Sequence, residues 1–552
     1  MNEAPNEAMN DPLTHRVRAS PGATALVDAD TGETWRYADL DAAVEETAGR
    51  LAALGLEAGD RLGIALEIRP AAVGLIHAAA RRGCVLVPLS TRLTAAELVP
   101  RIERADLAGL VCGAGTEETA LAATTAGPAE TATDAASTVP VASVDAPRRA
   151  KATALGEVAP RAFDPAAWEP DDPSAMLYTS GTTGTPKLVV LTAGNLLASA
   201  VASAFRLGVA PGDRWLDPLP IYHMGGLAPL FRAALYGTGI VLGDGQGSFD
   251  PGTTLQTLGE YDCTGISLVP TMLRRLLDAD DGRARSGDAN IDRAAGTGGS
   301  TRADEATGTE KDDDADGLPG SLRFVLLGGA PTPESLVERC ERRGVPVCPT
   351  YGTTETASQI STARPAEAFA HPGTVGRPLL GSDVTVVGPD GESLPVGEPG
   401  ELVVSGPTVF AGYYGDPAAT DAAFAEHGFH TGDAGYRDGA GRLWVLGRLD
   451  DRITTGGESV DPGEVRRTLR AHPAVCDAAV VGLPDEEYGE RVAALVVTAG
   501  GADDLTAEGL RAHCRERLAG FKLPRTIAFA DTLPRTASGT VARRAVRERL
   551  HE

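Results

Sequence analysis

The strongest local signal in the chain lies in residues 176–187, which read Met176-Leu177-Tyr178-Thr179-Ser180-Gly181-Thr182-Thr183-Gly184-Thr185-Pro186-Lys187. Small hydroxyl side chains alternate with glycines, so backbone N–H groups and hydroxyls are exposed together and can bind phosphate oxygens. Lys187 adds a positive charge for the same anion. The segment is not a P-loop of the G-x-x-x-x-G-K-[ST] type, because Lys187 lies three residues after Gly184 and no Ser or Thr follows it. A flexible linker is the alternative interpretation of this composition.

Short apolar runs alternate with helical patterns on both sides of this segment, as in residues 61–67, 70–82 and 84–88. This rhythm predicts an α/β fold with largely parallel sheets. Two segments interrupt it: residues 113–160 show little periodicity, and residues 279–319 contain almost no large apolar side chain. Because such a stretch cannot offset its ordering entropy, we predict a disordered surface insertion over about 279–319.

The pattern changes near residue 450. Residues 447–452 are polar and separate the apolar runs 442–446 and 478–482. The segment that follows has an α+β pattern of its own and is long enough for a small domain. We therefore predict an N-terminal domain over residues 1–449 and a C-terminal domain over residues 450–552, with a hinge near residue 450 that allows movement around a cleft.

The charge balance limits the class of partner. The 552 residues include 76 Asp and Glu but only 50 Lys and Arg, for a net charge of −26. This argues against a nucleic-acid-binding protein, which would have a basic surface. Four of the basic residues are lysines, Lys151, Lys187, Lys311 and Lys522. A GC-rich genome accounts for the excess of arginine, and adaptation to high salt, as in a halophilic protein, accounts for the carboxylates. The two explanations are compatible.

The chain shows no sign of export or of a membrane span. It has no run of about 18 apolar residues, and residues 1–13 are polar without the apolar core of a signal peptide. The seven cysteines are scattered without a CxxC pair, which predicts buried reduced thiols and neither a disulfide framework nor a zinc site. We expect a cytoplasmic protein.

Residues 176–187 resemble the phosphate-binding signature of the adenylate-forming superfamily of acyl-CoA synthetases, luciferases and adenylation domains. Four further motifs follow in the order typical of that family: Tyr351-Gly352-Thr353-Thr354-Glu355, Thr431-Gly432-Asp433, the stretch from Gly447-Arg448 to Gly456-Gly457-Glu458, and Leu533-Pro534-Arg535-Thr536-Ala537-Ser538-Gly539. The resemblance implies a large N-terminal domain of several subdomains and a small mobile α+β C-terminal domain. It also implies that ATP and Mg²⁺ activate a small carboxylic acid as an acyl-adenylate, which is then transferred to the thiol of CoA.

The resemblance also assigns roles to individual residues. By this resemblance, Lys187 and the hydroxyls and glycines of residues 179–184 bind the triphosphate, and Glu355 holds Mg²⁺. Residues 351–354 bind the nucleotide, and Asp433 and Arg448 bind its ribose. Asp450 is the hinge, and Gly456 and Gly457 face CoA. Residue chemistry agrees, because Mg²⁺ prefers carboxylate oxygens and an Asp accepts hydrogen bonds from hydroxyls. Ordinary turn acids at 355 and 433, a surface ion pair at 448 and a solvated acid at 450 are the alternatives.

One position departs from the family pattern. A lysine that contacts the carboxylate and the α-phosphate normally follows the last Ser-Gly, but this chain has Thr540 there. A neutral hydroxyl cannot replace a cation at developing negative charge. We expect Lys522, or else Arg543 or Arg544, to supply the cation. The third alternative is a protein that adenylates poorly.

The acyl substrate is expected to lie against the segments between the nucleotide motifs. In relatives the residue at the position of His223 gates the acyl tunnel and contacts the substrate. A packed core histidine is the alternative interpretation. Arg232 is an isolated cation in an apolar run, which is costly to bury unless it meets an anion, and a solvent-reaching arginine is the alternative. Further candidates for contact with the substrate are Ser267, Thr271, Gly328 and Gly329.

These segments look most like the o-succinylbenzoate–CoA ligases of menaquinone biosynthesis, and a substrate with two carboxylates would give Arg232 an anion to bind. A fatty or aryl acyl-CoA synthetase is the alternative enzyme. An adenylate-binding sensor that lost catalysis with the lysine is the alternative of another class. We expect no nucleic-acid partner, and the sequence leaves a homodimer open.

Overall fold

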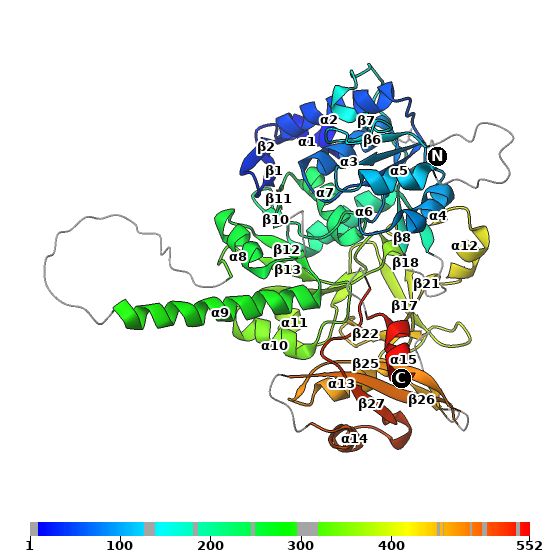
Figure 1. The fold of residues 1–552 in the computed structure, drawn as a ribbon. Helices are drawn as coiled ribbons and strands as arrows, with labels where there is room; N and C mark the ends of the chain where they lie inside the picture. Colours follow the sequence, from blue (N-terminus) through cyan, green and yellow to red (C-terminus); the bar gives the residue numbers. More distant parts are fainter. Residues whose placement is uncertain are drawn as a thin grey trace, which may run out of the picture.

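The structure, a computed structural model, describes residues 9–125, 139–179, 186–243, 249–294, 318–449, 453–455, 458–485, 488–499, 505–536 and 541–551. The described part of the chain contains four sheets, three of them before residue 450 (Figure 1). The α/β fold class predicted from the sequence, with a smaller C-terminal part, is confirmed.

An eight-stranded sheet, in the order β19-β9-β8-β4-β3-β5-β6-β7, contains both ends of the phosphate-binding segment. Strands β4, β3, β5, β6 and β7 are parallel, whereas β8 and β9 are antiparallel with Thr179 opposite Lys187. Thr179 and Lys187 of the segment are therefore held side by side. The bounds are β3 Arg61–Ala65, β4 Val85–Pro88, β5 Gly109–Cys112, β6 Val141–Ser143, β7 Thr153–Ala154, β8 Pro173–Thr179, β9 Lys187–Thr192 and β19 Gly412–Tyr413.

A nine-stranded sheet, in the order β16-β15-β14-β13-β12-β10-β11-β1-β2, forms the second layer. Strands β12, β13 and β14 are parallel neighbours, so their carboxyl ends meet at one edge of the sheet, where parallel sheets usually bind ligands. The bounds are β1 Thr24–Asp28, β2 Glu33–Arg36, β10 Arg214–Leu216, β11 Gly239–Leu242, β12 Gly265–Leu268, β13 Phe324–Leu327, β14 Val347–Tyr351, β15 Ser361–Thr362 and β16 Arg377–Pro378.

Helices cover both large sheets, and one buried cluster joins them. Ile64 of β3, Ile76 of α3, Leu230 of α7 and Ile240 of β11 belong to the same hydrophobic core. Several of these helices begin at a proline or at a side chain that accepts a hydrogen bond from the first turn, as Thr192 does for α6. The bounds are α1 Pro12–Ala19, α2 Tyr37–Ala53, α3 Pro70–Arg82, α4 Ala95–Ala105, α5 Glu117–Thr125, α6 Ala193–Leu207, α7 Met224–Tyr236, α8 Pro251–Glu260, α9 Pro270–Ala294, α10 Glu334–Arg342, α11 Pro365–Ala370 and α12 Pro417–Ala423.

A smaller antiparallel sheet positions the ribose motif. It contains β17 Asp383–Val387, β18 Gly400–Ser405, β21 Gly428–Arg437 and β20 Phe424–Ala425 in that order, and β22 Leu443–Arg448 pairs with β21. In this register Asp433 of β21 lies opposite Arg448 of β22. The two residues of the predicted ribose site are therefore cross-strand neighbours.

The C-terminal sheet follows β22 and has helices on both faces. Its strands are β24 Glu458–Val460, β23 Ile453–Thr455, β26 Gly489–Thr498 and β25 Val475–Asp485, with β27 Thr526–Phe529 paired to β26. Helices α13 Pro462–Arg470 and α14 Ala507–Arg515 pack on one face, and α15 Arg543–His551 packs on the other. The division at residues 449 and 450 stays a prediction, because Asp450 lies outside the described residues.

Two expectations about composition can be compared with the structure. Six of the seven cysteines are buried, but Cys476 is exposed, so the prediction of buried thiols is wrong for that residue. No helix among the described residues is long and apolar enough to cross a membrane.

The predicted disordered insertion over 279–319 is wrong at its start. Helix α9 continues to Ala294, and Asp280, which is 2% exposed, forms an ion pair with Arg343 just after α10. Asp281 pairs with Arg339 at 2.5 Å and also with Arg343. The acidic run that suggested disorder is therefore partly matched by arginines of another element, which the local composition does not reveal. Residues 295–317 lie outside the described residues.

Deleting residues 279–319 is expected to lower the thermal unfolding midpoint. The deletion removes Asp280 and Asp281 and leaves Arg343 without these partners, which costs about 3 kcal/mol when a buried pair loses one member. Replacing only residues 295–317 by a Gly/Ser linker keeps these ion pairs and is the control. Equal midpoints for the two variants in differential scanning calorimetry would contradict the structural role of residues 279–294.

Candidate active site

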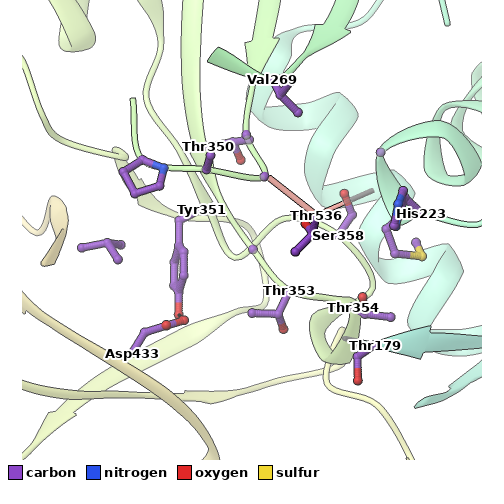
Figure 2. A pocket seen from close by; sticks show the side chains of 18 of the residues that line it. Thr179, His223, Val269, Thr350, Tyr351, Thr353, Thr354, Ser358, Asp433 and Thr536 are labelled. Atoms are coloured by element: carbon purple, nitrogen blue, oxygen red, sulfur yellow. Dashed lines mark hydrogen bonds between the residues drawn. The ribbon is translucent and has the colours of Figure 1, made fainter. Parts of the chain in front are cut away.

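A cleft of about 2520 Å³ lies where the two large sheets, the β21–β22 hairpin and the C-terminal part meet. Every predicted site residue that the structure describes lines it, with the exception of Lys522. These residues are Thr179, Lys187, His223, Arg232, Ser267, Thr271, Gly328, Gly329, Tyr351, Gly352, Thr353, Thr354, Glu355, Asp433 and Arg448. The predicted residues Ser180, Gly181, Thr182, Thr183, Gly184, Asp450, Gly456 and Gly457 lie outside the described residues. Figure 2 shows part of the cleft, with Thr179, Thr353 and Thr354 on one side and Tyr351 and Asp433 on the other.

Lys187 and Glu355 contact the same tyrosine, Tyr413, Lys187 at its ring and Glu355 at its hydroxyl. The Nζ atom of Lys187 is 4.4 Å from the centre of the Tyr413 ring, and Tyr413 Oη donates a hydrogen bond of 3.2 Å to Glu355 Oε1. Burial raises the pKa of the Tyr413 hydroxyl, so the phenol stays protonated and remains a donor. A cation and a carboxylate are thus fixed on one wall of the cleft, as a phosphate group with a bound magnesium ion requires.

The predicted ribose site is built around Asp433, whose two oxygens have different partners. Tyr351 Oη donates to Asp433 Oδ2 at 2.7 Å, and Arg448 Nη1 donates to Asp433 Oδ1 at 3.1 Å and to the carbonyl of Thr431 at 2.9 Å (Figure 2). The turn after Tyr351 needs a glycine, because a Cβ on Gly352 would lie 1.6 Å from the carbonyl oxygen of Ser358. These contacts hold the carboxylate at the cleft wall.

Acidification is expected to weaken ATP binding through Asp433. Burial raises the pKa of this carboxyl above its ordinary 3.8, against the opposing effect of Arg448. As the pH falls through the raised pKa, the carboxylate gains a proton and loses acceptor capacity, so KM for ATP should rise. Asp433→Asn should raise KM for ATP by about 10- to 100-fold at neutral pH, the equivalent of a hydrogen bond to a charged group. An acid limb of kcat/KM for ATP that is identical in the two proteins would contradict this assignment.

The acyl end of the cleft contains a buried cation. Arg232 of α7 is 4% exposed, its Nη1 donates to Ser203 Oγ at 2.7 Å, and its guanidinium lies 4.2 Å from the ring centre of Trp215. Arg232 Nη2 has no hydrogen-bond partner among the described residues. An unpaired guanidinium N–H at this depth is costly, so this end of the cleft suits an anion.

Asp217, which follows β10, interacts electrostatically with Arg232. Its side chain is fully buried, and burial raises the pKa of its carboxyl well above 3.8, although Arg232 opposes this. The described residues form no ion pair between the two within 4 Å. Burial lowers the pKa of Arg232 to about 10, so the guanidinium stays charged at neutral pH. The net effect is a positive charge that the surrounding protein only partly neutralises.

His223 immediately precedes α7 and faces the same cleft. Its Nε2 is buried without a hydrogen-bond partner among the described residues, and its ring packs 4.7 Å from that of Tyr222. Burial, and then the positive charge of Arg92, lowers the pKa of His223, so the imidazole is neutral at pH 7. The adjoining Gly226 is required by packing, because a Cβ there would lie 2.2 Å from the carbonyl oxygen of Leu219.

Sequence profiles identify the family. The profile described as AMP-binding enzyme matches residues 13–414, and that of the AMP-binding enzyme C-terminal domain matches residues 464–540. The chain belongs to the AMP-binding enzyme family. The 2-succinylbenzoate–CoA ligase of Bacillus licheniformis is 35% identical over 531 residues, which cover 96% of this chain and 98% of that protein.

Solved structures of one relative cover the whole chain. The o-succinylbenzoate CoA synthetase (MenE) of Bacillus subtilis in complex with the acyl-adenylate OSB-AMP is 32% identical, with a TM-score of 0.81 and 98% coverage of both chains. Its complex with ATP and magnesium ion has a TM-score of 0.80 and covers 99% of this chain and 100% of that one. A double mutant of that enzyme bound with the product analogue OSB-NCoA is equally similar in sequence and coverage, but its TM-score is 0.67.

The structure distinguishes Lys522, Arg543 and Arg544, the candidates to replace the lysine that relatives have at the position of Thr540. Lys522 does not line the cleft, and its Nζ lies 2.6 Å from Glu464 Oε2 in an ion pair. Arg543 lines the cleft at the start of α15. Burial, together with the charges of Arg547 and Arg448, lowers the pKa of Arg543 to about 10, whereas Asp433 raises it, so the guanidinium lies within electrostatic reach of the ribose site. The expectation that placed Lys522 first is therefore not supported in this arrangement.

Arg544 is the weaker of the two arginine alternatives. Its side chain is 93% exposed and its Nε lies 3.1 Å from Glu548. Thr540 lies outside the described residues, but Arg535 and Val541 on either side of it form a β-bridge, and Arg535, Thr536 and Val541 all line the cleft. The C-terminal signature thus reaches into the cleft.

Sequence reasoning missed two residues of the cleft wall, Arg92 and Tyr413, and two residues that contact Arg232, Trp215 and Ser203. Tyr413 lies 226 positions after Lys187, and its strand β19 reaches the site only because it pairs with β9. No periodicity or motif at these positions indicates a functional role. Only their position beside motif residues in the folded chain identifies them.

Proposed function

We propose that this chain is the acid–thiol ligase that activates 2-succinylbenzoate with ATP and transfers the acyl group to coenzyme A. Full-length relatives with that name support this proposal. The single observation that carries the choice of acid is Arg232 with its unpaired Nη2 at the acyl end of the cleft. 2-Succinylbenzoate has two carboxylates, so the one that does not react can pair with Arg232. A fatty acid would leave this buried cation without an anion, which is unfavourable.

In the first half-reaction an oxygen of the substrate carboxylate attacks the α-phosphorus of ATP, the P–O bond to the β-phosphate breaks, and pyrophosphate leaves. The catalytic task is to position the reactants and to neutralise charge on phosphate oxygens. Lys187 and Arg543 supply positive charge, and Asp433, Arg448 and Tyr351 fix the ribose. No covalent intermediate with the protein is needed.

Glu355 would hold the magnesium ion. The described residues contain no group of three or more His, Cys, Asp or Glu side chains that could bind a metal by themselves. One carboxylate with triphosphate oxygens and water is the ligand set that Mg²⁺ usually takes in nucleotide sites, so the residues fit the ion. When bound, Mg²⁺ neutralises charge on the phosphates of the leaving pyrophosphate.

The arrangement of the two domains is the one in which adenylation occurs. The signature around Thr536 and Arg543 lines the cleft, and the TM-score is 0.81 with the acyl-adenylate complex but 0.67 with the product-analogue complex of the double mutant. For the second half-reaction the C-terminal domain would turn about the hinge near Asp450. Gly456 and Gly457 would then face CoA, whose thiolate attacks the acyl carbon and displaces AMP.

His223 and the small residues around it would shape the acyl tunnel. A neutral imidazole with an unpaired Nε2 can bind a polar group of the substrate without repelling or neutralising its charge. Ser267, Thr271, Gly328 and Gly329 provide the opposite wall, at the carboxyl ends of β12 and β13. Cytoplasmic location, a homodimer and adaptation to salt stay predictions from the sequence.

Pyrophosphate release tests the proposal directly. With ATP, Mg²⁺ and CoA present, the protein is expected to release pyrophosphate with 2-succinylbenzoate and much more slowly with benzoate or a medium-chain fatty acid. Preference for the fatty acid would replace this substrate by the alternative acyl-CoA synthetase. Binding of ATP or AMP without pyrophosphate release from any acid would identify an adenylate sensor.

A further inference from the structure

Four arginines from both domains surround a second, small cavity beside the active-site cleft. Arg274 belongs to α9 of the N-terminal domain, whereas Arg466 and Arg470 belong to α13 and Arg535 belongs to the C-terminal signature. The N-terminal wall is completed by the loop from Gly329 to Pro333 and the start of α9. The cavity has a volume of about 20 Å³. We call the four arginines and this cavity the arginine seam.

A single carboxylate, Asp477 of β25, is shared by the three C-terminal arginines. Arg535 Nη2 lies 2.7 Å from Asp477 Oδ2, Arg466 Nη2 lies 3.1 Å from Oδ1, and Arg470 Nε lies 3.7 Å from Oδ1. Asp477 has 7% of its surface exposed, and the arginines lower the pKa of its carboxyl despite burial. Asp477 therefore contacts three arginines of the cavity, and Arg274 adds a fourth positive charge to its lining.

Arg274 makes this imbalance worse. It has no hydrogen bond or ion pair with any described residue, yet it lines the cavity opposite Arg466 and Arg470. Arg466 Nε is buried and has no hydrogen-bond partner among the described residues. Burial, and then the charges of Arg466 and Arg274, lowers the pKa of Arg470 to about 10, so the group remains charged at neutral pH while its charge is destabilised. The Asp477 network explains three of the arginines but not Arg274.

We propose that the arginine seam binds one small monovalent anion of the halide class, such as chloride, which bridges the two domains in the adenylation arrangement. A bound anion would balance the excess charge and accept hydrogen bonds from guanidinium N–H groups that lack a partner. A cavity of about 10–15 Å³ or more can hold one water-sized particle, so a volume of about 20 Å³ suits a monatomic anion such as chloride better than a phosphate group or a nucleotide.

The anion would also influence the active site. Arg535 is adjacent to Thr536 of the cleft wall, and the N-terminal loop from Gly329 continues from the predicted substrate wall. Because the seam exists only while α13 faces α9, an anion bound there stabilises that arrangement by mass action. Adenylation would therefore depend on the identity of the anion and not only on ionic strength.

Binding can be measured on the substrate-free protein by the line width of ³⁵Cl NMR at constant ionic strength, with gluconate replacing chloride. Saturable broadening is expected for the wild type, and Arg274→Gln should weaken the affinity at least tenfold. Arg515→Gln is the matched control, because it removes the same charge from α14 at an exposed ion pair with Glu508. Equal broadening in all three proteins, or none in the wild type, would overturn the proposal. Failure of the ligase proposal would not alter this result, because no substrate is present.

Stability in the two anions gives a second readout that a purely structural arginine would not produce. In gluconate, Arg274→Gln should raise the unfolding midpoint above that of the wild type, because it removes an uncompensated positive charge. In chloride this gain should shrink or reverse, because the wild type alone keeps the anion. A loss of stability of equal size in both salts would show that Arg274 only packs, and would overturn the proposal. If sulfate stabilised the wild type relative to Arg274→Gln more than chloride does at equal ionic strength, the proposal would also be overturned, whereas the general stabilisation by sulfate affects both proteins alike.

Discussion

Replacing Arg543 by alanine is expected to slow acyl-adenylate formation by about 10²- to 10³-fold, as the loss of one preorganised charge-stabilising group does in other enzymes. The reason is the position of Arg543 in the cleft, within electrostatic reach of Asp433 and Arg448, in a chain that has Thr540 where the family usually has lysine. The measurement is ATP–pyrophosphate exchange with 2-succinylbenzoate. Thioester formation from preformed acyl-adenylate should be spared, since the C-terminal domain presents another face to the cleft in that step.

Two further variants separate Arg543 from its alternatives. Lys522→Ala removes the same charge from the C-terminal domain, but the structure pairs Lys522 with Glu464 away from the cleft. A partly exposed pair of this kind contributes about 0–1 kcal/mol, so exchange should change little. Arg544→Ala should also be nearly silent, because that side chain is 93% exposed. Loss of exchange in Lys522→Ala with normal exchange in Arg543→Ala would restore the assignment first expected from the sequence.

Replacing Arg232 by glutamine is expected to raise KM for 2-succinylbenzoate strongly while changing kcat little. The carboxylate that pairs with Arg232 is present equally in the ground and transition states, so the lost interaction appears in binding. Removing one partner of a buried charge pair costs about 2–5 kcal/mol, the equivalent of about 30-fold or more in KM. Glutamine retains a donor for Ser203 and limits the damage to packing. Steady-state kinetics with saturating ATP and CoA give both constants.

A substrate without the second carboxylate provides the control for Arg232. Benzoate should be a poor substrate of the wild type, and its KM should be indifferent to Arg232→Gln. Ser203→Ala removes only the neutral hydrogen bond to Nη1 and should cost about 1 kcal/mol. If Arg232→Gln raises KM for both acids equally, the residue supports the shape of the tunnel and does not select the dicarboxylate.

The motif residues could be found from the sequence because the chemistry they perform is local. Phosphate binding uses consecutive backbone N–H groups and hydroxyls, so the order of residues 176–187 predicts this role. Thr179 and Lys187 of this segment lie opposite each other in β8 and β9. Arg232 was identifiable because a lone cation in an apolar helix loses solvation energy when it is buried, unless an anion is nearby. The start of the insertion could not be found in the same way. Asp280 and Asp281 are matched by Arg339 and Arg343, about 60 positions later, and composition within a window contains no information about such partners.

By itself the sequence determined the family, the order of the nucleotide motifs and the identity of fifteen residues that line the cleft, because each of these depends on short contiguous patterns. Only the tertiary structure decided how the charges are arranged. It placed Tyr413 between Lys187 and Glu355, Asp217 behind Arg232, Lys522 against Glu464 and Arg543 at the ribose site. The physical reason is that electrostatic energy depends on distance and burial, which are set by strand order and domain docking between segments that can be separated by more than 200 residues.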